Sequence, residues 1–474
     1  MDPAEFRTLG HELVEWIAAY RERLEELPVM SRVEPGEVAA QLPTEPPQQG
    51  VGLSDIVADL ERIVLPGITH WNHPGWFAYF PSNSDLASVL ADLVSSGLGP
   101  QGMSWQTSPA ATEVEDVVMD WLRQMIGLPE SFTGVIHDSA STATFTALLC
   151  ARERATGFAQ NRGGLQAEES PLVVYASDQA HSSIPKAALL AGFGAEHLRL
   201  VPTDDEHALR ADLLEEAVAE DRAAGLRPCA VVAATGTTAT TALDPVGRVA
   251  DVAERHGLWL HVDAALAGTA MICPEFRWMW EGVERADSLV FNPHKWMGPG
   301  FDLSAYYVRD PQHLVRVMST DPSYLRTAQD GLVRNLRDWG IPLGRRFRAL
   351  KLWFVLREHG VGGLQARIRR DVANAQRLKE QVDTADGWER LAPVPLQTVC
   401  LRHAPAALAG DEAALDNHNL AIVDAVNRSG QSYLSSAVVK GVRTIRVSIG
   451  AETTERRHVE AVWQALRDAA ASVR

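Results

Sequence analysis

The stretch LWLHVDA, residues 258–264, decides the fold class. It is an unbroken apolar run of strand length, and it ends next to a carboxylate, Asp263. Further runs of this kind are LVVYAS (172–177), CAVVAAT (229–235), SLVF (288–291) and LSAYYV (303–308). Helix-like stretches such as VGRVADVAERHG separate them. Strands that are apolar on both faces and alternate with amphipathic helices predict an α/β domain with a mostly parallel central sheet.

The segments on either side of this domain follow other patterns. Residues 5–27 repeat apolar side chains every three or four positions, which predicts a helix. A stretch rich in proline and glutamine follows, and then SDIVADLERIVL, a second helix with Ser54 as a plausible N-cap. The alternating strand RTIRVSIG (443–450) and a closing helix end the chain. We therefore expect a helical N-terminal arm (1–85), a large α/β domain (86–350) and a small α+β C-terminal domain (351–474).

The N-terminal arm and the composition together bear on partners and compartment. Helices joined by extended chain cannot bury their own apolar faces, so we expect the arm to pack on a second copy of the chain in an obligate homodimer. The formal net charge of −17 argues against nucleic acid or an anionic membrane as the main partner. Scattered cysteines without a CxxC pair, no signal-peptide pattern and no apolar run of membrane-spanning length indicate a cytoplasmic enzyme.

Two simple kinds of site are not predicted. AGFGAEH (191–197) offers only GxG and does not follow a strand, so it is a poor nucleotide-binding loop. His70 and His73 form an isolated HxxH without carboxylate or thiol partners nearby, so we expect no metal site there.

Small hydroxyl residues open an apolar helix in HDSASTATFTALLCAR, from residue 137. Free backbone N–H groups and the helix dipole at such a start bind a phosphate well, and Ser139 and Ser141 can add hydroxyl donors. Taken alone, an ordinary serine N-cap is the simpler explanation of the same residues.

Two further polar residues follow predicted strands. Asp263 lies at the carboxyl end of its strand, where ligands bind in open α/β sheets. A buried carboxylate there needs a cationic partner such as a protonated pyridine nitrogen, although a cap for the next helix explains it equally well. His181 of SDQAHSS follows LVVYAS, and its imidazole can stack on a flat aromatic cofactor and move protons. A histidine satisfied within the core is the usual alternative.

The fourth position is Lys295 in FNPHKWMGPG (291–300), a few residues beyond the strand SLVF. A desolvated amine can have a lowered pKa and form a Schiff base with a carbonyl, whereas a surface lysine lying along apolar neighbours is the alternative. A phosphate-binding helix start, a stacking histidine, a strand-end aspartate and a lysine, in this chain order, are the parts needed to hold pyridoxal 5′-phosphate.

The chain resembles the pyridoxal-phosphate-dependent group II decarboxylases, and within them the aromatic-L-amino-acid decarboxylases. The matching segments are THWNHPGWFAYFPS, SPAATEVEDVVMDWL, SDQAHSS, WLHVDAALAG, ICPEFR, FNPHKW, DPSYL and IPLGRRFRALKLWFVLR. They cover most of residues 5–375, and the match is looser in the C-terminal hundred residues. The resemblance implies a homodimer with the α/β fold type I of pyridoxal-phosphate-dependent transferases, and active sites at the subunit interface.

The resemblance also implies roles for individual residues. Lys295 would hold the cofactor covalently, Asp263 would pair with its ring nitrogen, and His181 would stack on the ring. The other cofactor-binding residues would be Ser139, Ala140, Ser141, Thr238, Ala265, Asn292 and His294. The substrate pocket would include Trp71, Tyr79, Phe80, Pro81, Ser82, Gln101, Met103 and Gly344.

The reaction outcome in this family depends on a proton donor. It is a tyrosine on a mobile loop, aided by the stacking histidine, and Tyr324 of DPSYL matches it. In related aldehyde synthases the tyrosine is typically phenylalanine, or the histidine is replaced by asparagine. Since Tyr324 and His181 are both present, the resemblance favours simple decarboxylation to an amine. An aldehyde synthase and a protein that keeps only the fold are the alternatives.

Four positions bear on the substrate. Gly344 of PLGRR stands where the aromatic decarboxylases tend to have glycine and the histidine decarboxylases serine. Gln101, Met103 and Leu266 stand where isoleucine, phenylalanine and tyrosine are usual in the animal enzymes. A flexible methionine fills irregular space and can admit an indole ring. We expect tryptophan as the substrate, with phenylalanine, tyrosine and DOPA as alternatives.

Overall fold

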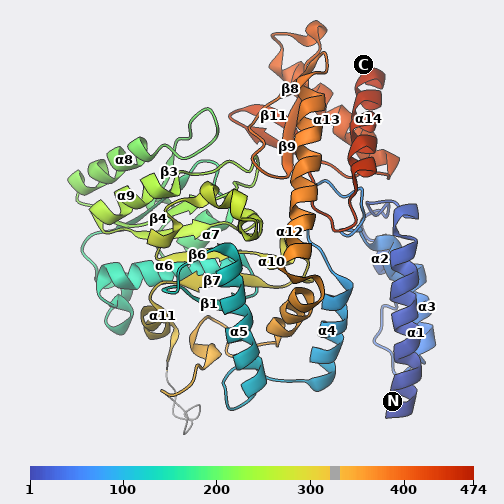
Figure 1. The fold of residues 1–474 in the computed structure, drawn as a ribbon, viewed down its shortest axis with the longest axis horizontal. Helices are drawn as coiled ribbons and strands as arrows, with labels where there is room; N and C mark the ends of the chain where they lie inside the picture. The colour runs from blue at the N-terminus through green and yellow to red at the C-terminus, as the bar shows by residue number, and fades with distance from the viewer. Residues whose placement is uncertain (321–330, 474) are drawn as a thin grey trace. The chain divides into compact units, whose positions relative to one another are not determined.

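The computed structural model describes residues 1–320 and 331–473 (Figure 1). Contacts between residues divide the chain into two compact units. The first unit comprises Met1–Pro81, Thr384–Glu389 and Arg402–Arg474, and the second comprises Ser82–Asp383 and Arg390–Leu401. The N-terminal segment thus groups with C-terminal residues. The three domains expected from the sequence, and the packing of the arm on another subunit, stay predictions.

The second unit is built on a seven-stranded sheet with the order β1-β7-β6-β5-β4-β2-β3. Its strands are β1 (Thr133–His137), β2 (Leu172–Ser177), β3 (Leu198–Val201), β4 (Arg227–Ala234), β5 (Trp259–Asp263), β6 (Ser288–Phe291) and β7 (Ser304–Val308). Neighbours from β3 to β6 pair in parallel, and β7 is antiparallel to both β6 and β1. The predicted α/β fold with a mostly parallel sheet is confirmed, and all strands except β7 end at the same edge.

Helices cover both faces of this sheet (Figure 1). The α-helices described in this unit are α4 (Leu86–Leu98), α5 (Pro109–Ile126), α6 (Ala140–Thr156), α7 (Ser183–Leu190), α8 (Ala211–Ala223), α9 (Val246–His256), α10 (Pro293–Trp296), α11 (Pro311–Met318) and α12 (Arg348–Asp383). Alternate strand residues share a buried core with α6, α7 and α11. The intervening strand residues face the opposite side of the sheet, toward α5 and α8. Thus Tyr175 donates to Asp221 of α8 at 2.8 Å, and Tyr307 donates to the carbonyl of Met119 in α5 at 2.7 Å.

The long helix α12 packs against α4 and α5 within the same unit. It bends at Gly360, whose φ of 60° lies in the left-handed region that glycine adopts without steric cost. The bend divides α12 into a first part next to the PLGRR segment and a second part that continues to Asp383.

The first unit contains five helices and most of a smaller sheet. The helices are α1 (Pro3–Glu22), α2 (Glu37–Ala40), α3 (Leu53–Asp59), α13 (Glu412–Ser429) and α14 (Arg456–Ser472). The sheet has the order β10-β11-β9-β8, with β8 (Trp388–Arg390), β9 (Thr398–His403), β10 (Ser435–Val439) and β11 (Val442–Ser448). Asp2 caps α1 by accepting from the N–H groups of Ala4 and Glu5, yet α1 buries none of its residues.

Some local expectations differ from the structure. Ser54 is not an N-cap, because α3 begins at Leu53 after Gly52 and has no side-chain cap. A serine already inside the first turn cannot offer its hydroxyl to the amides that a cap satisfies. Strands β1 and β3 were not predicted. None of the described helices is long and apolar enough to span a membrane.

Candidate active site

The carboxyl ends of the parallel strands bring the expected cofactor residues to one edge of the sheet. Ser139 follows β1, His181 follows β2, and Thr238 follows β4. Asp263 is the last residue of β5, and Lys295 lies in α10 directly after β6. Residues far apart in the sequence therefore meet where open α/β sheets bind their ligands.

Lys295, Asp263 and His181 form the charged centre of this edge. Burial lowers the pKa of the Lys295 amine, and the nearby charge of Asp263 opposes that shift. Burial also lowers the pKa of His181, while Asp263 raises it and Lys295 lowers it. Because Asp263 acts on both Lys295 and His181, and Lys295 acts on His181, the three side chains lie within range of one another's charges. A lysine with a lowered pKa populates its neutral, nucleophilic form at lower pH.

Asp263 is held by the loop that follows its strand. Its side chain is 7% exposed, and its Oδ1 accepts from the Ala265 N–H at 3.0 Å. The carbonyl of Ala265 in turn accepts from the Asn292 N–H at 2.9 Å. The carboxylate is therefore fixed in place, and the same loop connects the end of β5 to the residues that precede Lys295.

The His181 ring is oriented by Ser183, the first residue of α7. The Ser183 N–H donates to His181 Nδ1 at 3.0 Å, and the Ser183 hydroxyl lies 2.7 Å from the same atom. Because Nδ1 accepts the backbone hydrogen bond, the neutral ring carries its proton on Nε2. This arrangement holds the imidazole plane and leaves a proton-bearing nitrogen on its far side.

Asn292 and His294 connect the lysine helix to the start of β7. The Ser304 hydroxyl donates to Asn292 Oδ1 at 2.7 Å, and His294 Nδ1 lies 3.0 Å from the Leu303 nitrogen. Burial, together with the charge of Lys295, lowers the pKa of His294 to about 4. His294 is thus neutral near pH 7, and its role beside a phosphate stays a prediction.

The start of α6 fits both explanations of its serines, an ordinary N-cap and a phosphate-binding helix start. Ser139 is the N-cap, and its hydroxyl accepts from the Thr142 N–H at 3.2 Å. Ala140 is buried, whereas Ser141 is exposed and directed away from the core. The simpler explanation, a serine cap, therefore holds for Ser139. The backbone amides at this start and the exposed Ser141 suit a phosphate.

Comparison with known proteins identifies the family. The model of the pyridoxal-dependent decarboxylase conserved domain matches residues 35–404. The chain belongs to the pyridoxal-dependent decarboxylases. This membership confirms the carboxy-lyase class and the pyridoxal phosphate cofactor expected from the sequence.

Similar proteins include enzymes with different reported products. The aromatic-L-amino-acid decarboxylase of Rattus norvegicus is 41% identical over 100% of this chain and 99% of that protein. The phenylacetaldehyde synthase of Arabidopsis thaliana is 41% identical over 99% of this chain and 96% of that protein. The crystal structure of Oryza sativa TDC with PLP and tryptamine superposes with a TM-score of 0.96 at 38% identity, covering 99% of this chain and 98% of that one.

The edge of the decarboxylase sheet has the chemistry that pyridoxal phosphate requires. A desolvated amine, Lys295, can react with the cofactor aldehyde, and the buried Asp263 carboxylate suits a protonated ring nitrogen. The helix start at Ser139 suits the phosphate. Thr238 is exposed beyond β4, and Ala265 is half-buried in the loop after Asp263. The contacts of these two residues with the cofactor stay predictions.

Three residues expected in the substrate pocket, Gln101, Met103 and Gly344, belong to neighbouring segments of the second unit. The Arg345 N–H donates to Gln101 Oε1 at 2.7 Å, and a Cβ added to Gly344 would lie 3.1 Å from Gln101 Nε2. The carbonyl of Met103 accepts from the Arg337 N–H at 2.8 Å. The loop around residues 101–103 is thus joined to the segment that contains Gly344.

A buried ion pair missed in the sequence supports that loop. Arg345 Nη2 lies 2.9 Å from Glu115 Oε1, and both side chains are nearly inaccessible to solvent. Glu115 Oε1 also accepts from the Ile136 N–H at 2.9 Å, at the end of β1. The sequence did contain a signal for this ion pair. Glu115 lies four residues after Ala111, on the face of α5 that is otherwise apolar and buried, and a buried carboxylate needs a partner.

The other expected pocket residues lie in the first unit, apart from Ser82, which begins the second. Trp71 and Tyr79 are exposed, and their rings stack with centroids 6.0 Å apart. Tyr79 has a φ of 51°, an unusual conformation for a tyrosine that often marks functional sites. Phe80 and Pro81 are buried. Their contact with substrate stays a prediction, and Tyr324 lies outside the described residues.

Two cavities in the second unit contrast with each other. A small one of about 80 Å³ joins the start of α6, at Asp138 and Thr142, to Gly344 and Arg346. It links the segments that are expected to bind the phosphate and the substrate, but it is too small for an aromatic amino acid.

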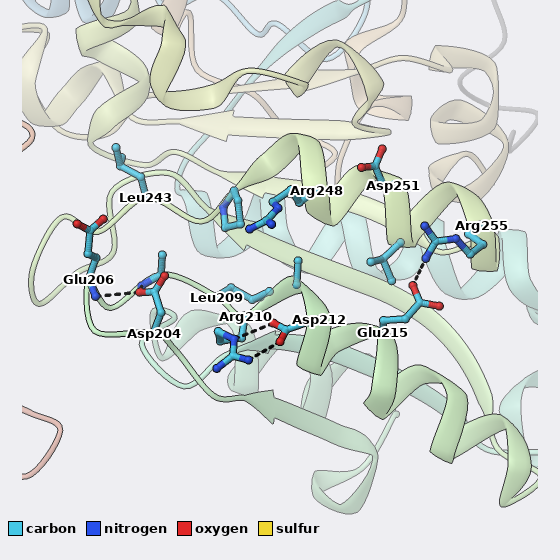
Figure 2. Close-up of a pocket in the computed structure, with 14 residues that line it drawn as sticks. Asp204, Glu206, Leu209, Arg210, Asp212, Glu215, Leu243, Arg248, Asp251 and Arg255 are labelled. Atoms are coloured by element: carbon cyan, nitrogen blue, oxygen red, sulfur yellow. Dashed lines mark hydrogen bonds and ion pairs between the residues drawn. The ribbon is translucent and has the colours of Figure 1, made fainter.

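The other pocket, of about 760 Å³, lies between α8 and α9 (Figure 2). Its lining includes the ion pairs Arg210–Asp212 and Arg255–Glu215, and none of the expected site residues. Since these charges already pair with each other, the pocket is a charged surface groove apart from the chemistry.

Proposed function

We propose that this enzyme decarboxylates an aromatic L-amino acid, with tryptophan favoured, to the arylalkylamine and CO₂. The observation that carries the proposal is the meeting of Lys295, Asp263 and His181 at one sheet edge, where burial lowers the pKa values of Lys295 and His181 and the charge of Asp263 opposes both shifts. Tryptophan is supported by the similarity to the rice protein solved with tryptamine and by the flexible Met103.

Each side chain has a task in this reaction. When bound, pyridoxal phosphate supplies an electron sink for the bond that breaks as CO₂ leaves. Lys295 would hold the cofactor covalently through its amine. Asp263 would keep a proton on the ring nitrogen. His181 would stack on the ring, and the Tyr324 hydroxyl would deliver a proton to the substrate Cα.

An aldehyde synthase is the second candidate function. The Arabidopsis phenylacetaldehyde synthase is as similar to this chain as the rat decarboxylase, so overall identity does not separate the two reactions. The residues do favour one of them. The chain has both Tyr324 and His181, whereas aldehyde synthases typically replace one of this pair.

Product analysis tests this proposal. With a panel of aromatic L-amino acids we expect amine and CO₂ in equal amounts, with the highest kcat/KM for tryptophan, and little hydrogen peroxide or ammonia. Tyr324→Phe is expected to lower the amine yield and raise aldehyde and peroxide, because the proton donor is lost. Tyr20→Phe, in the N-terminal helix, is the control. Equimolar peroxide from the unaltered enzyme would rule out the decarboxylase proposal, and unchanged amine output from Tyr324→Phe would rule out its role.

We also propose that the enzyme is a homodimer. Leucines on α4 form an exposed apolar stripe, since Leu86 is 51%, Leu90 49% and Leu93 51% exposed. Their spacing puts them on one face of the helix. Such a stripe is costly in water unless another surface covers it. The absence of any buried residue in α1 supports the same conclusion, since an amphipathic helix gains its stability from a partner surface.

The double variant Leu90→Asp/Leu93→Asp is expected to convert the dimer to a monomer, because two charges would enter the covered face. Light scattering after size exclusion measures the mass. Leu190→Asp, at a leucine on α7 that is 66% exposed and outside the α4 stripe, is the matched control and should leave the mass unchanged. A double variant that stays dimeric would place the interface elsewhere.

A further inference from the structure

The backbone carbonyls of residues 295–298 accept hydrogen bonds from distant parts of the chain. Helix α10 has only four residues, so the carbonyls at its end find no partner within the helix. Each is satisfied from another part of the second unit. The Lys295 carbonyl accepts from Asn83 Nδ2 at 2.8 Å. Arg367 Nη2 donates to the Trp296 carbonyl at 3.0 Å and also to the Met297 carbonyl. The Asp85 N–H donates to the Gly298 carbonyl at 3.0 Å.

We infer that Asn83 is a positioning residue for Lys295. This inference rests on the proposed role of Lys295 as the cofactor-binding lysine. Asn83 is 1% exposed and lies in the segment before α4, more than two hundred positions earlier in the chain. Among the donors to this segment described above, it is the one that binds the main chain of the lysine itself.

The main chain of Lys295 is held from both sides. Its N–H donates to the Asn292 carbonyl at 2.9 Å, and its carbonyl accepts from Asn83. Asn292 is itself fixed to the loop after Asp263 through the Ala265 carbonyl. The Lys295 Cα is therefore placed relative to Asp263 on one side and Asn83 on the other. Loss of the Asn83 donor removes this buried hydrogen bond from the Lys295 carbonyl, so the short helix that carries the lysine is held less firmly.

The hydrogen bond between Gly300, five residues after Lys295, and Ser88 provides a matched control for the Asn83 variants. The Gly300 N–H donates to the Ser88 hydroxyl at 2.7 Å, and Ser88 is 1% exposed. Ser88→Ala removes a buried hydrogen bond to the same stretch of chain without touching Lys295. If Asn83 only stabilises the fold, Asn83→Ala and Ser88→Ala should behave alike.

The test uses the cofactor-loaded enzyme. For Asn83→Ala and the similarly shaped Asn83→Leu, kcat is expected to fall about tenfold to a hundredfold, the effect of misplacing a reacting group, with KM changing far less. The pH at which the visible absorbance of the bound cofactor titrates is expected to shift, and the cofactor should dissociate faster. Ser88→Ala should keep the titration and kcat of the unaltered enzyme. Asn83→Leu removes the donor without leaving a cavity or adding a buried charge, so it covers the case in which Asn83→Ala fails to fold.

Two outcomes separate this inference from the proposed function. Borohydride reduction followed by peptide mass analysis reports whether the cofactor is attached at Lys295 in the unaltered enzyme. If it is not, the proposed role of Lys295 fails. If it is, but the Asn83 variants titrate and turn over like Ser88→Ala, only the positioning role is wrong.

Discussion

Lys295→Ala is expected to lower the rate of decarboxylation by roughly 10³-fold or more, because it removes the group that holds the cofactor. The purified variant should also lose the visible absorbance of covalently attached pyridoxal phosphate. The physical reason lies in the environment of the amine. Burial lowers its pKa, so the neutral nucleophile is populated at lower pH than for an exposed lysine, while the nearby Asp263 limits the shift.

The control for this experiment is Lys186→Ala, at an exposed lysine in α7. It removes the same charge from the second unit and should leave both the absorbance and the rate unchanged. A thermal unfolding curve for each variant shows whether the fold is retained. If Lys295→Ala keeps its activity with the fold intact, the cofactor is held by another residue and the assignment of the site is wrong.

Much of the central sheet could be predicted because its strands are buried on both faces. Strands β2 and β6 have the predicted limits, and β4, β5 and β7 differ by a few residues at most. Strand β1 was missed because Gly134 weakens its local pattern. In the structure a Cβ at Gly134 would lie 2.5 Å from Met119 and 2.6 Å from Tyr307. That glycine is required by tertiary packing, which no local pattern reveals.

In the candidate site, too, some positions could be predicted from the local sequence and others depend on tertiary contacts. The positions of Asp263 and His181 at the sheet edge could be predicted, because each stands at or just beyond the end of an apolar strand, and parallel strands end at one edge. Asn83 carried no such signal. It precedes a helix in a polar stretch, and its hydrogen bond to Lys295 joins two positions that lie more than two hundred residues apart in the chain. Long-range contacts of this kind follow from the fold rather than from the local sequence.

Asp263→Asn is expected to lower kcat by roughly 10² to 10³-fold, similar to the loss of one preorganised electrostatic group in other active sites. Asparagine has nearly the same shape, and its Oδ1 can still accept from the Ala265 N–H, so the loop should stay in place. The lost feature is the negative charge beside Lys295 and His181. Without it the cofactor ring nitrogen would lose the proton that makes the ring an electron sink.

Asp244→Asn is the matched control, because Asp244 is also a buried aspartate next to the same sheet. It accepts from the N–H groups of Leu209 at 2.8 Å and Ala234 at 2.7 Å, and burial raises its pKa to about 7. Its task is to satisfy backbone donors, so Asp244→Asn should lower the thermal midpoint and leave kcat unchanged. Asp263→Asn should show the opposite pattern, with low kcat and a nearly unchanged midpoint. Equal kcat values in the two variants would mean that the Asp263 charge takes no part in the chemistry.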